Sequence, residues 1–482
     1  MVSSSIRLAK SSTRITSTSN NLSPIHKDLS SSSEQGKGWK LRKALAQTRA
    51  VVKDYQAGTP SVDQVLDKPT SFATLASMLK QCGETKALHD GRLVHFYIKK
   101  FRYDRNTYLG NWLVKMYGDC GSMDDARAVF ESLPKLNCHS WNILMKGYVT
   151  NGFGKETLEC FRLMQHRDIN PNRVTFLCAL DACVDLGDIE KGREVHFAIM
   201  KAGCEGEALV GTALINMYGK CGSLADARTV FQCLPKRDVV TWNVMISVCA
   251  QTGHGTEALQ LFDQMQCHGC KPNKITYVSA LNACGSLAAL EKGQEIHSAI
   301  ANSGCESEVV VGTTLIHMYG KCGALQEATN VFLRLPQRNL VSWNAMIAAY
   351  AQNGHGKEAL DFFGEMQSDG FRPDQFTFLS VLAACRHTGH VDDAKHYFVS
   401  MNQDHGIKPD EEHYLCLIDI LGRAGHLDDA ENLISFMPFR NVARAWLYLL
   451  AACRLHGDVE RGVRAADHVF KLDPDNLQLL FF

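Results

Sequence analysis

The chain carries no net charge that would attract a polyanion. Its 51 Lys and Arg residues are balanced by 51 Asp and Glu residues along 482 positions. Proteins that bind nucleic acid through general electrostatic attraction usually have a basic surplus. Any binding to nucleic acid must therefore come from a local surface rather than from the charge of the whole chain.

Long apolar runs and the common catalytic signatures are also absent. No stretch approaches the roughly 18 consecutive apolar residues of a membrane span. No glycine-rich phosphate loop and no nucleophile elbow is present. A zinc deaminase needs H-x-E for one ligand and the general acid/base, followed by P-C-x-x-C, and the chain has no H-x-E. We therefore expect no enzymatic activity, no cofactor, no small-molecule substrate and no membrane partner.

The 18 cysteines form no recognisable metal site or disulfide framework. The one C-x-x-C, Cys267–Cys270, lies in a turn and has no second ligand pair, which makes it weak evidence for a metal. Most other cysteines recur at fixed positions on expected helix faces, where Cys is a small buried hydrophobe. The pattern favours a reducing compartment and a structural role for the thiols.

A period of 101 residues organises most of the chain. The segments Ile215–Ile246 and Ile316–Ile347 agree at 19 of 32 positions without a gap. A constant period of this kind indicates a solenoid built by stacking one supersecondary unit. We expect a packing role for the histidines that keep the same step. The periodic histidines and cysteines are His95, His196 and His297, and Cys82, Cys183, Cys284 and Cys385.

Each period divides into two longer units and one shorter unit, as in Lys274–Glu308, Leu340–Asp374 and the shorter Val309–Asn339. In the unit Leu340–Asp374, apolar residues recur at helical spacing until a break at Asn353–Gly356. A second amphipathic helix then runs through Ala359 and Met366 before a Gly and a Pro end it. The predicted fold class is therefore all-α, a right-handed superhelical solenoid of helix–turn–helix repeats that bury each other's apolar faces.

The repeats are expected to fill residues 72–442 in about 11 units, and residues 443–482 form a different, tetratricopeptide-like extension. The predicted units are Phe72–Asn106, Thr107–Asn137, Cys138–Asn172, Arg173–Glu207, Ala208–Asp238, Val239–Asn273, Lys274–Glu308, Val309–Asn339, Leu340–Asp374, Gln375–Asp410 and Glu411–Val442.

These features resemble the pentatricopeptide repeat (PPR) proteins of plants. The resemblance rests on the alternating unit lengths, the Val-Thr-Trp-Asn opening at Val240–Asn243, and unit endings such as Lys271–Asn273 and Arg372–Asp374. Mixed long and short units are similar to the PLS class, whose members mostly act in organellar RNA editing. Residues 443–482 look like a truncated E-type extension, without the DYW deaminase domain. A break at Phe482 suggests truncation or a partner that covers the end.

The resemblance implies a surface that reads single-stranded RNA at one base per repeat. The family reads bases with the fifth and the last residue of a unit. The second residue packs against the base face, as Val240, Val310 and Val341 would, while His139 would stack. The reading pairs carried onto this sequence are Asn111 with Asn137, Asn142 with Asn172, Thr212 with Asp238, Asn243 with Asn273, Thr313 with Asn339, and Asn344 with Asp374.

The correspondence known for the family turns these pairs into an expected RNA. From the unit at Thr107, 5′ to 3′, it gives pyrimidine, pyrimidine, any base, G, pyrimidine, any base, A and U. Two unspecified bases follow under residues 375–442, with an edited C a few nucleotides downstream. Units with Leu177/Glu207 and Val278/Glu308 have an apolar fifth residue and are expected to be spacers or partner-binding surfaces.

A simpler interpretation is that the last-place Asn and Asp residues only cap helices. One such residue fits a cap as well as a reader, but six polar pairs favour reading. The resemblance thus implies site recognition for C-to-U RNA editing, with a deaminase-bearing or editing-accessory protein acting in trans. An RNA processing or stability factor and a protein–protein interaction scaffold are the alternatives.

The segment 1–33 differs from the repeats. Twelve of its residues are Ser, and no Asp or Glu precedes Asp28. This composition is typical of an organellar transit peptide, although a disordered tail has a similar one. It favours the mitochondrion slightly over the chloroplast. Residues 34–71 form an expected linker with a basic helix, Trp39–Tyr55, whose charged face is more often solvated than bound to RNA.

Overall fold

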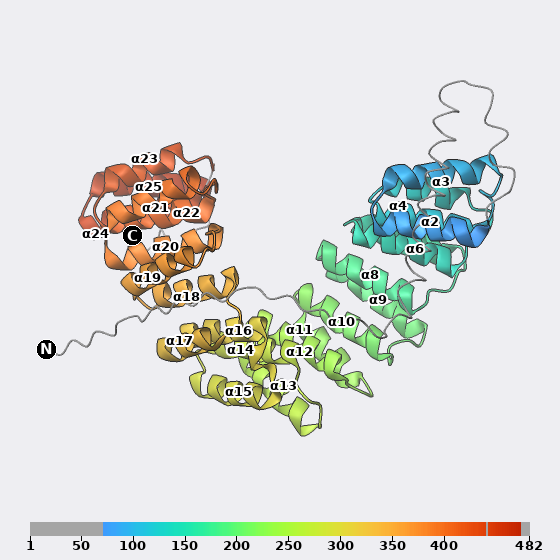
Figure 1. Cartoon of the computed structure of the whole chain (residues 1–482), viewed down its shortest axis with the longest axis horizontal. Coiled ribbons are helices and arrows are strands. Elements are labelled where there is room, and N and C mark those ends of the chain that lie inside the picture. The colour runs from blue at the N-terminus through green and yellow to red at the C-terminus, as the bar shows by residue number, and fades with distance from the viewer. Residues whose placement is uncertain (1–70, 440–441, 474–482) are drawn as a thin grey trace, which may run out of the picture. The chain divides into compact units, whose positions relative to one another are not determined.

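The computed structural model describes residues 71–439 and 442–473. Within these ranges the chain forms helices and turns and no strand (Figure 1), so the predicted all-α class is confirmed. None of the described helices combines the length and the apolar character that crossing a membrane requires. The expected transit peptide (1–33), the basic helix Trp39–Tyr55 and the apolar end at Leu479–Phe482 lie outside the described residues.

Every repeat opens with a helix of 13 or 14 residues. Each of these helices begins at the residue where the periodic sequence places the start of a unit. They are α2 (Phe72–Glu84), α4 (Thr107–Asp119), α6 (Cys138–Thr150), α8 (Arg173–Leu186), α10 (Ala208–Lys220), α12 (Val239–Gln251), α14 (Lys274–Leu287), α16 (Val309–Lys321), α18 (Leu340–Gln352), α20 (Gln375–Thr388), α22 (Glu411–Arg423) and α24 (Ala443–His456).

The second helices explain the two unit lengths. Those of the short units, α5, α11, α17 and α23, are one turn shorter than the other second helices. The second helices are α3 (Leu88–Lys100), α5 (Met123–Ser132), α7 (Gly154–His166), α9 (Ile189–Lys201), α11 (Leu224–Cys233), α13 (Gly255–Cys267), α15 (Leu290–Ser303), α17 (Leu325–Arg334), α19 (Gly356–Ser368), α21 (Val391–Gln403), α23 (Leu427–Phe436) and α25 (Val459–Leu472). A 3₁₀ turn, η2 (Cys305–Ser307), follows α15.

The chain divides into two compact units, one ending at Asn151 and the other beginning at Gly152. In the first, α4 packs against α2 and α6. In the second, the first helices from α8 to α24 pack against one another in chain order. Because each repeat contacts mainly the next repeat, both units have the construction of a solenoid.

A Trp in fourth place couples neighbouring repeats. Trp141, Trp242 and Trp343 are only 1–2 % exposed. Each ring meets, edge to face, a Phe from the second helix of the preceding repeat, with centroids 4.8, 4.9 and 4.7 Å apart. Aromatic rings bury large areas and prefer this geometry, so the Trp-Asn sequence of the period is first of all a packing element.

The periodic histidines join neighbouring helices. Nδ1 of His95 lies 2.8 Å from the hydroxyl of Tyr117, and His196 and His297 repeat this contact with Tyr218 and Tyr319 at 2.8 Å. Burial and, to a smaller extent, the nearby Lys99 lower the pKa of His95 to about 4. The ring is therefore neutral at pH 7 and shares a hydrogen bond with the tyrosine hydroxyl, in keeping with a structural role.

The cysteines are free thiols, and all 18 lie within the described residues. Cys183, Cys284 and Cys385 occupy one repeat position and are fully buried. Burial raises the pKa of each of these three thiols to about 12. Since the thiolate is the reactive form, these side chains are inert packing groups.

Candidate nucleic-acid interface

The last residue of each polar pair is the N-cap of the next repeat's first helix. In all six cases its Oδ1 accepts a hydrogen bond from the backbone N–H three residues later. The bonds are Asn137 with Ser140 (2.9 Å), Asn172 with Thr175 (3.2 Å), Asp238 with Thr241 (2.9 Å), Asn273 with Thr276 (3.1 Å), Asn339 with Ser342 (2.9 Å) and Asp374 with Thr377 (2.9 Å). The capping interpretation is thus correct as local structure.

A cap uses only one of the two polar atoms of the side chain. Among the described residues, the second atom makes no hydrogen bond in Asp238, Asn273, Asn339 and Asp374. The first three side chains are exposed and that of Asp374 is half-buried. In Asn this second atom is the donor Nδ2, whereas in Asp it is the acceptor Oδ2. The helix end therefore fixes the side chain while a distinct polar atom remains available.

Two of the six pairs are joined directly. Asn243 donates from Nδ2 to Oδ1 of Asn273 over 3.1 Å, and Asn344 donates to Oδ1 of Asp374 over 3.0 Å. Asn243 is 4 % exposed, so its amide is largely a support for the more exposed Asn273. The two residues of each of these pairs are therefore in contact, and their joint reading of a base stays a prediction.

A third pair is joined through an intermediate hydroxyl. Oγ1 of Thr212 lies 3.0 Å from Oγ1 of Thr241, and Thr241 donates to Oδ1 of Asp238 over 2.9 Å. Thr241 was not recognised as part of the site from the sequence, although its fixed place after each cap is a visible signal.

Among the described residues, no hydrogen bond joins Asn111 to Asn137 or Thr313 to Asn339. Oδ1 of Asn111 and Oγ1 of Thr313 are buried and have no hydrogen-bond partner among the described residues. Asn142 lies on α6, where its Nδ2 is 3.6 Å from Sγ of Cys138. Its sequence partner Asn172 caps α8, which belongs to the other compact unit.

Exposed apolar side chains occupy second place on the first helices. Val240, Val310 and Val341 are 55 %, 63 % and 61 % exposed, and His139 is exposed as well. Val240 precedes Asn243 by three residues, a spacing that puts both on one helix face. The same place holds further exposed side chains that the sequence prediction did not name. They are Tyr108, Val174, Leu209, Ile275 and Phe376.

Two of the longer units, Arg173–Glu207 and Lys274–Glu308, carry ion pairs in place of polar pairs. Glu207 lies 3.8 Å from Arg173, and Glu308 lies 3.6 Å from Lys274. Neither Glu caps the helix that follows it. The surface pairs contribute little stability, and the apolar fifth residues beside them offer no hydrogen bond to a base edge.

The exposed apolar row does not continue into α22 and α24. Their second residues are Glu412 and Arg444, which form a two-pronged ion pair with both N···O distances at 2.9 Å. The third residue of α22 is the buried His413, which contacts Oδ1 of Asp410 at 2.5 Å. The chemistry of the surface therefore changes after α20.

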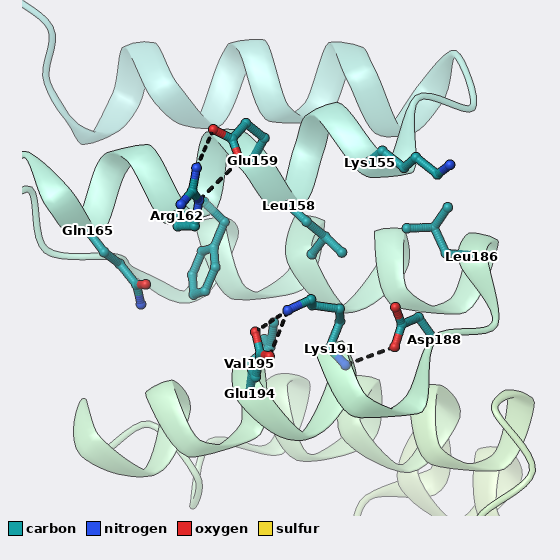
Figure 2. Close-up of a pocket in the computed structure, with 11 residues that line it drawn as sticks. Lys155, Leu158, Glu159, Arg162, Gln165, Leu186, Asp188, Lys191, Glu194 and Val195 are labelled. Carbon is teal, nitrogen blue, oxygen red and sulfur yellow. Dashed lines mark hydrogen bonds and ion pairs between the residues drawn. The ribbon is translucent and has the colours of Figure 1, made fainter.

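A groove of about 590 Å³ lies along α7 and α9 (Figure 2). Most of its charged side chains are paired within it, as Arg162 is with Glu159 at 2.8 Å and Lys191 with Glu194 at 2.7 Å. The groove gathers no cluster of one charge sign, and we assign it no ligand.

The C-x-x-C sequence gains no further ligand. Cys267 is exposed at the end of α13, and Sγ of Cys270 lies 3.9 Å from the carbonyl oxygen of Arg237. In the part of the chain that the structure describes, no group of three His, Cys, Asp or Glu side chains is placed to hold a metal ion.

Comparison with known sequences identifies the repeat. The PPR repeat family matches residues 136–185, 237–286 and 338–387, and the PPR repeat matches residues 212–239, 313–340 and 412–442. These segments include the Trp-Asn helices and the caps described above.

Proteins of Arabidopsis thaliana are similar over most of the array. Pentatricopeptide repeat-containing protein At4g18520, chloroplastic, is 41% identical over 317 residues, which cover 66% of this chain and 51% of that protein. Pentatricopeptide repeat-containing protein CRR2, chloroplastic, is 39% identical over 412 residues, covering 84% of this chain and 63% of that protein. The chain thus spans about half to two thirds of these relatives.

A solved structure shows the same fold. The crystal structure of the pentatricopeptide repeat protein PPR10 in complex with an 18-nt psaJ RNA element matches with a TM-score of 0.67 at 20% identity. The match covers 90% of this chain and 67% of that one. The repeat matches and the plant relatives show that the chain belongs to the pentatricopeptide repeat proteins.

Proposed function

We propose that the chain binds single-stranded RNA in a sequence-specific manner. The observation that carries the proposal is the division of labour within the last-place side chains. One atom caps a helix and a second polar atom remains available, on repeats whose second residue is exposed and apolar. Stacking surfaces of this kind hold unpaired bases, and polar atoms distinguish base edges.

The available atoms agree with the bases expected at two sites. At Asn344/Asp374 the remaining atom is an acceptor, Oδ2, which requires an N–H on the base edge, as uracil has. At Asn243/Asn273 it is a donor, Nδ2, which suits the acceptor edge of cytosine. The difference between Asn and Asp therefore becomes a difference between C and U.

The finer proposal is site recognition for C-to-U editing in an organelle. The chain would select the transcript, and a deaminase-bearing or accessory protein would supply the catalysis in trans. The alternation of short and long units supports this assignment. Among the organelles, the relatives described as chloroplastic favour the chloroplast. The mitochondrion, which the amino-terminal composition slightly favours, has no support from them.

An RNA-binding titration tests the proposal. The probe is an RNA containing 5′-CCUGCUAU-3′, which satisfies the expected order of bases, and the control is an RNA of the same composition in shuffled order. We expect the full chain to bind the first RNA at least tenfold more tightly in gel-shift titrations. Equal affinity for both would contradict sequence-specific reading and favour an interaction scaffold.

The editing role needs a separate experiment. RNA crosslinked to the protein in purified chloroplasts and mitochondria is sequenced, and the bound sites are compared with the positions of C-to-U conversion. Sites lying a few nucleotides 5′ of converted cytidines support editing. Binding at transcript ends, away from any converted base, would assign the chain to RNA processing or stability.

A further inference from the structure

Within each compact unit, a buried hydroxyl stands beside every polar pair, in third place of the helix that the last residue caps. Ser140, Thr241, Thr276, Ser342 and Thr377 are all 0 % exposed. A buried hydroxyl is costly unless it is hydrogen-bonded. The hydrogen bonds of this hydroxyl therefore show how the adjacent polar pair is arranged.

Where the third residue is Thr, its hydroxyl contacts the fifth residue of the preceding repeat. Oγ1 of Thr276 lies 2.5 Å from Oδ1 of Asn243. Oγ1 of Thr377 lies 2.6 Å from Oδ1 of Asn344. In each case the amide oxygen is engaged by the hydroxyl, so Nδ2 must point toward the last residue of the pair. The threonine thus fixes the orientation of the asparagine side-chain amide.

Where the third residue is Ser, this contact is absent. Ser342 donates to the backbone oxygen of Asn339 over 2.8 Å, and Ser140 donates to Oδ1 of Asn137 over 3.1 Å. The corresponding fifth-place atoms are those of Thr313 and Asn111. Both are buried without a hydrogen-bond partner among the described residues.

The difference between the two hydroxyl residues has a steric basis. Threonine carries two heavy atoms on Cβ, which restricts its χ1 angle. Serine lacks the methyl group, so its hydroxyl is freer to turn away from the preceding repeat. The threonine hydroxyls contact the preceding repeat as well as their own cap residue. The exchange of Ser for Thr therefore changes a hydrogen bond in the neighbouring repeat, although it looks conservative in the sequence.

Counting hydroxyl protons shows what the contact with the third-place Thr does when the fifth residue of the pair is also Thr. Thr241 donates its single hydroxyl proton to the carboxylate of Asp238, which only accepts. The contact between Thr212 and Thr241 must then use the proton of Thr212. Thr212 is left with lone pairs only. The buried hydroxyl of Thr313, with Ser342 behind it, has no hydrogen-bond partner among the described residues, so its proton is not committed.

We propose that the third residue of each following helix is a specificity-determining residue. It sets whether the fifth residue of the preceding repeat offers a hydrogen-bond donor or an acceptor to the base. Thr in this place fixes the donor or acceptor character of the fifth residue, whereas Ser does not fix it. The inference rests on the proposed RNA-binding function. At Thr212/Asp238 two acceptors face the base, which suits the N–H groups of guanine. At Thr313/Asn339 a hydroxyl donor is retained, which suits an acceptor edge such as that of adenine.

Two reciprocal substitutions test the proposal, Thr241→Ser and Ser342→Thr. The readout is the ratio of dissociation constants for RNAs that differ only in having G or A at the matching position. Thr241→Ser should lower the preference for G at its site about fivefold, the effect of one neutral hydrogen bond. Ser342→Thr should lower the preference for A at its site by a similar factor. Each variant should leave the other site unchanged.

The control is Thr74→Ser, the same exchange in third place of α2, which is the first helix that the structure describes. Melting curves show whether each variant folds, and the two test variants lie on different helices, so one measurement remains decisive if the other variant is unstable. A wild-type chain without base preference would overturn the proposed function itself. A wild-type preference that both folded variants retain in full would overturn only the role of the third residue.

Discussion

The side-chain amide of Asn344 donates to Oδ1 of Asp374 over 3.0 Å. Asn344 lies on the first helix of its repeat, and Asp374 is the last residue of the same repeat. The same oxygen accepts the backbone N–H of Thr377 and thereby caps α20. One carboxylate oxygen thus links a helix end to the helix before it. The second oxygen is left for a ligand, and its position is set by the packing of α18 against α20.

Substitution of Asn273 separates capping from reading. Asn273→Asp should keep the cap of α14, because Asn and Asp cap equally well, and should move the base preference from C toward U. Asn273→Ala should cost about 1 kcal/mol of stability through the lost cap and lose the preference. Thermal melting, monitored by circular dichroism, measures the change in stability. Gel-shift titrations measure the change in base preference. A loss of stability in the Asp variant equal to that in the Ala variant would contradict the argument.

The double variant Thr313→Asn with Asn339→Asp exchanges one reading pair for another. It should change the preference at that site from A to U without weakening binding to the matched RNA. Competition gel shifts with the two RNAs measure the change, and the unaltered Asn344/Asp374 site serves as the internal control. If the double variant still prefers A, the carried-over reading positions are wrong.

The exposed apolar side chains in second place should contribute to RNA affinity without contributing to folding stability. Phe376→Ala removes a side chain that is 71 % exposed, so melting should shift little. Base stacking on an aromatic side chain is worth about 1–3 kcal/mol, and RNA affinity should fall at least fivefold. Glu412→Ala, at the same place in α22, is the matched control and should leave affinity unchanged. An equal effect of both variants would show that the row extends past α20.

The histidine contacts predict a loss of stability in acid. The pKa of His95 is lowered from its ordinary value of 6.5 to about 4 by burial, so the unfolded chain binds its proton more readily. This contribution to stability is present above pH 6.5 and is lost as the pH falls toward 4. Urea unfolding of the wild type and of His95→Gln at pH 7 and pH 4.5 measures it. The variant should lose less stability in acid, and an equal loss in both would rule out this role.

The repeat architecture was accessible from the sequence because the period is constant. Residues such as Trp242 and His196 recur at one step, and their neighbours alternate at helical spacing, so the positions of the helices follow. The Asn and Asp residues at the ends of units were visible for the same reason. Whether they are caps or readers was posed as an alternative, but the structure shows that a capping side chain keeps a second polar atom.

The hydrogen bonds of the third-place Ser and Thr hydroxyls could not be predicted from the period of the sequence. Ser342 and Thr241 are similar residues at equivalent places, and only the side-chain directions distinguish their hydrogen bonds. Those directions depend on packing between repeats rather than on local pattern. The exposed residues Ile275 and Phe376, in contrast, stood in a place that the sequence prediction had already singled out, and extending that position along every unit would have found them.

The presence of separate polar atoms on one capping side chain also bears on how such an array changes over time. Replacing Asn by Asp at the end of a repeat alters the atom left for a ligand, but it keeps an oxygen for the helix end. A lineage can therefore acquire a new target sequence one repeat at a time, without passing through an unstable intermediate. The chemistry of the helix cap makes the recognition surface evolvable.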